Sequence, residues 1–218
     1  ADVFRKEICA EFLEDGAGVF RFITKAQRAT WLDKPKPGTQ YVMGVDWAKH
    51  NDFSVLTIGD PQTNEIVHLE RFNEVDWNVQ IDRAIRVARE WNNALVLIDS
   101  TGVGDVIFDT MRGAYPKVLG YNIFNNAEKT ALIQKLQLGF EQLEVATPDP
   151  TTDRSSGRLA IVAQRELETY GYRMSTTGKF IYGPPEGYHD DCVMSLALCW
   201  WQMQNRPEPY RFRSVKGV

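Results

Sequence analysis

Three short runs of apolar and β-branched residues follow one another in the first third of the chain. They cover residues 41–47, 53–59 and 65–72, with turn residues such as Asn51-Asp52 and Asp60-Pro61 between them. Connections this short usually join consecutive antiparallel strands. The pattern therefore predicts three antiparallel strands of one sheet.

A helix and a buried strand are predicted next. Apolar residues recur at helical spacing from Trp77 to Trp91, with Asp76 placed to cap the first turn, and a nearly continuous apolar run then ends at Asp99. A strand, a crossover helix and a second strand of the same sheet form a right-handed unit with parallel strands. The strand ending at Asp99 should therefore lie parallel to, and beside, the strand that contains Asp46.

The rest of the chain continues the alternation of helices and strands. The expected elements are a helix from about residue 105, a short strand near 117–121, a helix over about 127–143, a loop at 148–157, a helix to about 169, a hairpin around 172–182 and a closing helix over about 189–203. The whole pattern predicts an α/β fold. Its mixed five-stranded sheet has three antiparallel and then two parallel strands, flanked by helices, with an extra hairpin and a closing C-terminal helix.

Composition favours one folded domain with a segment before it and a short tail after it. With 218 residues, 43% of them hydrophobic, the chain can bury the core of one domain. The Pro/Gly-rich run from Lys34 to Gly38 is typical of a linker. We therefore expect a linker segment over residues 1–40, a domain over 41–204 and a C-terminal tail over 205–218.

Net charge and cysteine content restrict the class of protein. A formal charge of -4 argues against a surface that binds nucleic acid throughout, although a cluster of metal-binding carboxylates would also make the charge more negative. The three cysteines form no CxxC pair, so they predict neither disulfides nor a zinc site but a reducing, cytosolic setting. Without a leader peptide or an apolar stretch of about 20 residues, the protein is expected to be soluble.

Two aspartates stand at the ends of strands that should be neighbours. Asp46 follows the run from Val42 to Val45, and Asp99 closes the most apolar strand of the chain. Carboxylates a few ångströms apart repel each other unless a cation lies between them. A single aspartate at a strand end usually caps a turn, but two on neighbouring strands indicate a cation site.

The closing helix begins with two further aspartates. A carboxylate at a helix start is ordinarily an N-cap, and this interpretation stays open for Asp190. Asp191 falls on the helix face of Met194 and Leu198, so it should point into the protein. His189 has no sequence partner at metal-ligand spacing and stays outside the predicted site.

The segments around these acids resemble a known family. The resemblance spans residues 41–203 and is carried by Gly44-Val45-Asp46-Trp47 with Asp52-Phe53-Ser54-Val55-Leu56 after it, by Leu97-Ile98-Asp99-Ser100-Thr101-Gly102-Val103-Gly104-Asp105, and by His189-Asp190-Asp191-Cys192-Val193-Met194-Ser195-Leu196-Ala197-Leu198. The three motifs, in this order, resemble the nuclease domain of the large terminase subunit of tailed bacteriophages, the DNA-packaging motor. Because the chain has no GxxxxGK[ST] sequence, we expect the ATPase to be a preceding domain outside it.

The resemblance implies a ribonuclease H-like fold and a metal-dependent endonuclease that cuts double-stranded, concatemeric viral DNA during packaging. Asp46, Asp99 and Asp191 would be the catalytic and metal-binding acids, with Asp190 in reserve. Two Mg2+ or Mn2+ ions would be bound, because hard oxygen ligands suit these cations. In a two-metal scheme Asp46 would bridge both ions, and Asp99 and Asp191 would each complete one coordination shell.

The same resemblance implies a substrate and partners. Lys49 and Lys129 are candidates for contacting the DNA phosphate, although ordinary surface charge is the more usual role of such lysines. The expected partners are double-stranded DNA, the small terminase subunit and the portal of the procapsid. The expected location is the cytoplasm of the host cell, without a membrane.

Three other interpretations compete with this one. Other ribonuclease H-like nucleases, of the junction resolvase or transposase type, would use the same acids on other DNA structures. A nuclease fold without chemistry would serve only as a module that docks DNA or assembly partners. The actin and sugar-kinase group shares a related sheet topology, but it needs a second domain to enclose a nucleotide, for which 218 residues leave no room.

Overall fold

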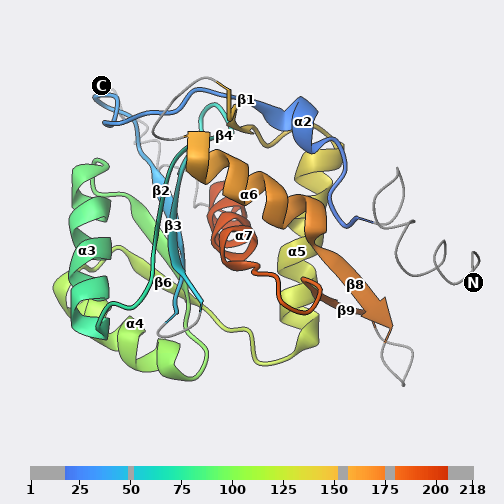
Figure 1. The fold of residues 1–218 in the computed structure, drawn as a ribbon. Helices are drawn as coiled ribbons and strands as arrows, with labels where there is room; N and C mark the ends of the chain where they lie inside the picture. The colour runs from blue at the N-terminus through green and yellow to red at the C-terminus, as the bar shows by residue number, and fades with distance from the viewer. Residues whose placement is uncertain (1–17, 49–51, 152–156, 175–179, 206–218) are drawn as a thin grey trace, which may run out of the picture.

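A five-stranded mixed sheet forms the centre of the molecule (Figure 1). The computed structural model describes residues 18–48, 52–151, 157–174 and 180–205. The strands are β2 (Val42–Asp46), β3 (Ser54–Asp60), β4 (Glu65–Phe72), β5 (Leu95–Asp99) and β6 (Val118–Tyr121), in the order β4-β3-β2-β5-β6. The pairs β2–β3 and β3–β4 are antiparallel, and β2–β5 and β5–β6 are parallel. The predicted sheet is therefore confirmed.

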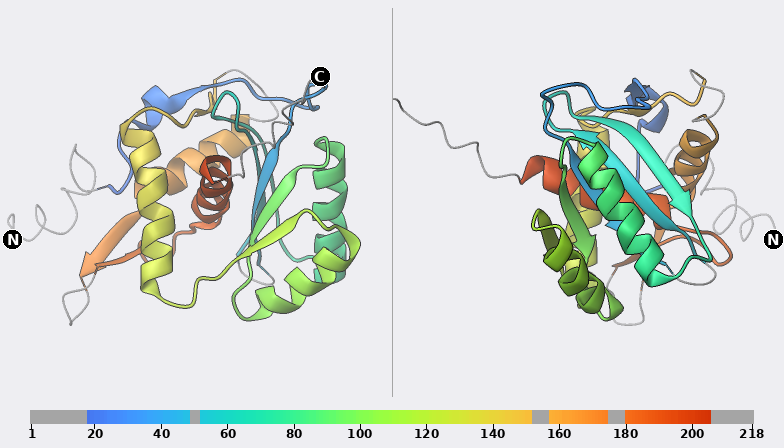
Figure 2. Two further views of the ribbon diagram at one scale, coloured as in Figure 1. Left: turned by 180° about the vertical axis from the view of Figure 1, so that it is seen from behind. Right: turned by 90° about the vertical axis from the view of Figure 1, so that its left-hand side faces the viewer.

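Helices cover both faces of the sheet and make three layers (Figures 1 and 2). On one face lie α3 (Trp77–Glu90) and α4 (Val103–Ala114), and on the other lie α5 (Asn126–Glu141), α6 (Gly157–Thr169) and α7 (Asp191–Gln204). Two clusters of buried apolar residues fill the spaces between the layers, one on each side of the sheet. No helix among the described residues is long and apolar enough to cross a lipid bilayer.

The helix starts differ in how they are capped. In α5, Asn125 and Glu128 form a reciprocal capping box, in which each side chain binds the backbone N–H of the other's position. Asp76 occupies the N-cap position of α3, as predicted, but its side chain makes no capping hydrogen bond. The predicted capping role of Asp76 is therefore wrong. Packing of the buried face of α3 against the sheet supports this helix instead.

Helix α7 is buried on nearly all sides and touches the backbone of β2. A Cβ atom at Gly44 would clash with backbone atoms of Ser195 and Cys199, so only glycine permits this approach. The Ser195 hydroxyl donates a hydrogen bond of 3.0 Å to the Gly44 carbonyl and lies 2.8 Å from the Thr57 hydroxyl. The contact fixes the start of α7 beside the end of β2.

Several short elements complete the fold. The α2 turn (Ile23–Ala26) leads into β1 (Gln27–Ala29), which pairs in parallel with β7 (Thr147–Pro148), and neither strand was predicted. Val19 and Phe20 are buried in the core beside α5, α6 and α7, so this part of the predicted linker packs on the domain. The domain boundaries stay a prediction. The expected hairpin is present as β8 (Gly171–Met174) and β9 (Phe180–Gly183).

Candidate metal centre

An open cleft of about 500 Å³ lies where β2 and β5 end and α7 begins. Five carboxylates and one lysine are among the side chains that line it: Asp46, Asp52, Asp99, Asp190, Asp191 and Lys129. In open α/β sheets, ligands bind beyond the carboxyl ends of the strands. The three predicted acids therefore meet at the place where this architecture presents a site.

Strand pairing brings Asp46 and Asp99 to the same edge of the sheet. In the parallel pair β2–β5, Val45 lies opposite Ile98, and the two aspartates follow directly. Burial raises the pKa of Asp46 well above its usual value, the nearby carboxylates raise it further, and Lys129 opposes the shift. A carboxylate in such surroundings favours a bound proton or a bound cation.

Asp99 is held by the turn that follows it. The Thr101 hydroxyl donates a 2.6 Å hydrogen bond to Asp99 Oδ1, and the Thr101 N–H donates another of 2.9 Å to the same oxygen. The hydroxyl in turn accepts a 2.7 Å hydrogen bond from the Ile123 N–H. One oxygen of Asp99 is thus occupied by its own turn, and among the described residues nothing is hydrogen-bonded to the other.

Asp191 is the first residue of α7 and is 5% exposed, so it points into the protein as predicted. The Phe53 N–H donates a 3.2 Å hydrogen bond to its Oδ2. Burial raises the pKa of Asp191 to about 6, with the charges of Glu166 and Asp52 adding to the shift and the Phe53 hydrogen bond and Arg71 opposing it. Like Asp46, this carboxylate favours a bound proton or a bound cation.

Asp190 and Lys129 form an ion pair at the cleft. Asp190 stands at the N-cap of α7, yet its side chain makes no capping hydrogen bond. Lys129 Nζ instead donates to Asp190 Oδ2 at 3.1 Å, with about a quarter of each side chain exposed. The interpretation of Asp190 as a cap is therefore wrong, and Lys129 does line the cleft. The other candidate, Lys49, lies outside the described residues.

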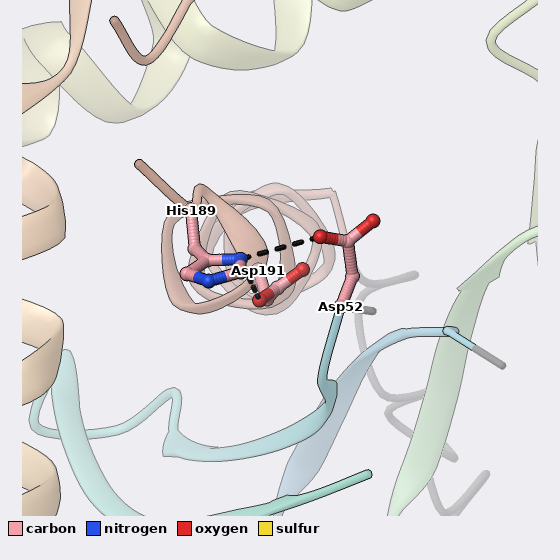
Figure 3. Close-up of side chains that lie close together, drawn as sticks. All are labelled: Asp52, His189 and Asp191. Atoms are coloured by element: carbon pink, nitrogen blue, oxygen red, sulfur yellow. Dashed lines mark hydrogen bonds and ion pairs between the residues drawn. The ribbon is translucent and has the colours of Figure 1, made fainter. Parts of the chain in front are cut away.

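A histidine joins the acids in a way that the sequence did not indicate (Figure 3). His189 Nδ1 lies 3.2 Å from Asp52 Oδ1 and 3.7 Å from Asp191 Oδ2. Ligand atoms of these three side chains all lie within 4.8 Å of one another, so they form a group that can hold a metal ion. Asp52 belonged to a recognised motif but was not singled out. His189 was placed outside the site because it has no sequence partner at metal-ligand spacing, whereas the structure pairs it with Asp52, 137 residues away.

Comparison with known proteins agrees with this architecture. No protein-family model matches the chain. The large terminase subunit of Thermus virus P23-45 is 30% identical over 217 residues, covering 96% of this chain and 42% of the relative. The large terminase subunit of Thermus phage G20c is 29% identical with the same coverage. The chain thus spans less than half the length of the curated relatives it matches.

Solved structures extend the likeness to the fold. The large terminase nuclease of thermophilic phage G20c, solved with bound magnesium, has a TM-score of 0.76 at 26% identity, covering 86% of this chain and 98% of that one. The nuclease domain of the large terminase of bacteriophage SPP1, solved with bound manganese, has a TM-score of 0.51 at 12% identity, covering 80% and 95%, and shares the fold alone. By sequence and by its ribonuclease H-like fold, this chain is a homologue of the nuclease domain of phage large terminase subunits.

Proposed function

We propose that this chain is the nuclease of a phage DNA-packaging terminase and that it hydrolyses phosphodiester bonds of double-stranded DNA with divalent metal ions. One observation carries the proposal. Asp46, Asp99 and Asp191 come from three separate elements into one open cleft. The homologous nuclease of phage G20c has been solved with bound magnesium and with bound cobalt.

The side chains of the cleft fit a hard divalent cation. Carboxylate oxygens are the ligands that Mg2+ and Mn2+ prefer, and an open cleft leaves positions for water and phosphate. Burial, with nearby carboxylates adding to it, raises the pKa of Asp46 and of Asp191, as expected for acids that favour a bound cation. The acids outnumber the lysine that lines the same cleft.

We assign the roles of the acids from their positions. The charges of Asp191, Asp190 and Asp99 all act on Asp46, which supports the role of Asp46 as the acid that would be shared by two Mg2+ or Mn2+ ions. Asp99 and Asp191 would each complete the ligands of one ion, and Asp190 stays in reserve while it pairs with Lys129. Ions held by these residues would supply activation of the attacking water and stabilisation of the departing oxygen. Lys129, which lines the cleft, would contact the DNA phosphate.

Digestion of a supercoiled plasmid tests the proposal. We expect nicked and linear products with Mg2+ or Mn2+ and none with a chelator, and we expect Asp99→Asn and Asp191→Asn to abolish cutting while remaining folded. Cutting that persists in the chelator would exclude a metal-dependent nuclease. A module that only docks DNA would leave the plasmid intact with every metal, and a junction resolvase would cut branched DNA in preference to the plasmid.

The wider role follows from the relatives and is part of the proposal. The substrate would be concatemeric viral DNA, cut in the cytoplasm of the host cell. The partners would be the small terminase subunit and the portal of the procapsid. Pull-down of each partner by the full-length large subunit is the corresponding measurement, since the chain covers 42% of the curated relatives.

Removing the hydroxyl that holds Asp99 should weaken catalysis. A hydrogen bond to a charged group contributes roughly 1.5–3 kcal/mol, so Thr101→Val should lower the initial rate of plasmid cutting by about 10-fold or more. Thr101→Ser keeps the hydroxyl and should retain most of the rate. Equal rates for the valine and serine variants would show that the hydrogen bond to Asp99 Oδ1 does not matter for cutting.

A further inference from the structure

An arginine and a glutamate that do not line the cleft lie near Asp191 on the side of the protein interior. Arg71 comes from β4 and Glu166 from α6, and their side chains are 14% and 7% exposed. Arg71 Nη2 lies 3.4 Å from Glu166 Oε1 and 3.7 Å from Asp191 Oδ2. One guanidinium nitrogen thus faces both carboxylates from inside the protein.

The guanidinium of Arg71 lies over an aromatic ring. Its central carbon lies 3.4 Å from the centroid of the Phe53 ring, well within the range of a cation–π contact. The backbone N–H of the same Phe53 donates to Asp191 Oδ2. Arg71 Nε is buried without a hydrogen-bond partner among the described residues, which is unfavourable and calls for a reason beyond packing.

Glu166 fixes the other side of the arrangement. Its Oε2 accepts a 2.7 Å hydrogen bond from the Cys192 N–H, in the first turn of α7, the helix that Asp191 begins. Helix α7, Glu166 and Arg71 are therefore linked to one another. A change at Arg71 would therefore affect Asp191 by a direct contact inside the protein and not by way of the side chains that line the cleft.

The contacts of Asp191 all fall on one of its two oxygens. Within the described part of the chain, the Phe53 N–H, Arg71 and His189 all approach Oδ2, and none of these contacts involves Oδ1. We propose that Arg71, anchored by Glu166, is a positioning residue that holds Oδ2 of Asp191 so that Oδ1 is free to bind the metal ion. This proposal rests on the metal site of the proposed function.

Positioning and simple electrostatics predict opposite effects. Arg71 is a cation close to a cation site, so if only its charge mattered, its removal would strengthen binding of Mn2+ at pH values well above the pKa of Asp191. If Arg71 orients a ligand, its removal would weaken binding, because residues that orient metal ligands typically contribute about 10-fold or more in affinity. The sign of the change in Mn2+ affinity therefore distinguishes a positioning role of Arg71 from a purely electrostatic one.

The test is isothermal titration of Mn2+ into the wild type, Arg71→Met and the double variant Arg71→Met/Glu166→Gln. The double variant removes both charges of the Arg71–Glu166 pair, so its net charge is unchanged and Glu166 is not left as a buried charge without its arginine. The amide oxygen of the introduced glutamine can still accept the hydrogen bond from the Cys192 N–H. Both variants are expected to bind Mn2+ about 10-fold more weakly than the wild type.

A matched control is available in the same molecule. Arg83 also pairs with a glutamate, Glu70, at 2.7 Å and also stacks on a phenylalanine, Phe72, at 4.2 Å, but it does not reach the cleft. Arg83→Met should leave Mn2+ affinity unchanged within about twofold, which is below the effect expected for a residue that orients a ligand.

Unchanged or tighter Mn2+ binding in a folded double variant would overturn the proposal, and folding is checked by circular dichroism and thermal melting. If the double variant does not fold, the Mn2+ affinity of the Arg71→Met variant decides in the same way. Plasmid cutting is measured separately. A wild type that binds Mn2+ without cutting DNA would overturn the proposed function and leave the positioning role supported by the titration, whereas a wild type that binds no Mn2+ would overturn both.

Discussion

Replacing Asp46 by asparagine is expected to lower the rate of DNA cutting by about 1000-fold or more. Asparagine has nearly the same size and keeps one oxygen, but it carries no charge with which to bridge two cations. The charges of Asp191, Asp190 and Asp99 all act on Asp46, which lines the same cleft as these three acids. Single-turnover cutting of a plasmid with Mg2+ measures the effect.

The same substitution should make the metal-free protein more stable. Burial and three neighbouring carboxylates raise the pKa of Asp46, which means that its charged form is unfavourable in the folded state at neutral pH. Asparagine removes that charge, and a gain of about 1 kcal/mol corresponds to a rise in Tm of about 2–4 °C for a chain of this size. Thermal melting in chelator at pH 7.5 measures it.

Asp60→Asn is the matched control for both effects. Asp60 also ends a strand and is 3% exposed, but it lies at the opposite end of the sheet and accepts a 2.9 Å hydrogen bond from the Gln62 N–H. This variant should cut DNA at the wild-type rate and show no gain in Tm. An Asp46→Asn protein that still cuts DNA, with wild-type contamination excluded, would remove Asp46 from the catalytic site.

Lowering the pH from 7.5 to 5 is expected to weaken Mn2+ binding by more than about 10-fold while it stabilises the metal-free protein. The pKa of Asp191 is raised to about 6, so at pH 5 most molecules must lose a proton from this acid before they bind a metal ion. Asp46, whose pKa is also raised, adds to the effect in the same direction.

The sign of the stability change follows from the same shifts. A carboxyl with a raised pKa binds its proton more tightly in the folded than in the unfolded state, so it favours folding at low pH. This contribution is lost as the pH rises from the ordinary value of 3.8 through about 6 for Asp191. Melting in chelator and titration with Mn2+, both between pH 5 and 7.5, measure the two trends.

The variant Asp191→Asn tests whether Asp191 contributes to this pH dependence of stability. In this variant the rise in Tm at lower pH should become smaller, because Asp191, one of the three described carboxyl groups whose pKa is raised, with Asp46 and Glu166, no longer titrates. Wild-type Mn2+ affinity that stays constant over this pH range would contradict the assignment of Asp46 and Asp191 as ligands.

Much of the sheet and part of the cleft could be predicted because their signals are local. Strands of alternating or continuous apolar residues and helices of regular period appear where the sequence indicates them. The crossover rule then places Asp46 beside Asp99 without any knowledge of the rest of the fold. Helical spacing also predicted that Asp191 points into the protein, as it does, although α7 is buried on nearly all sides.

The residues that the sequence did not reveal are those whose roles depend on contacts between distant parts of the chain. Arg71 and Glu166 are 95 residues apart, and neither stands in a motif or at a strand end. The pairing of β1 with β7 involves only a few residues from remote segments, too short for any periodicity to appear. For such contacts the sequence carries no local signal, because tertiary packing alone brings the partners together.

The spacing of two acids of the proposed site depends on Gly44, a residue that does not line the cleft. Backbone atoms of Ser195 and Cys199 lie where a Cβ atom at this position would be, so any larger residue would have to move α7 away from β2. Asp191 begins that helix and Asp46 ends that strand, so such a movement would separate the two carboxylates. The absence of one side chain in the sheet thus keeps two acids of the cleft close together.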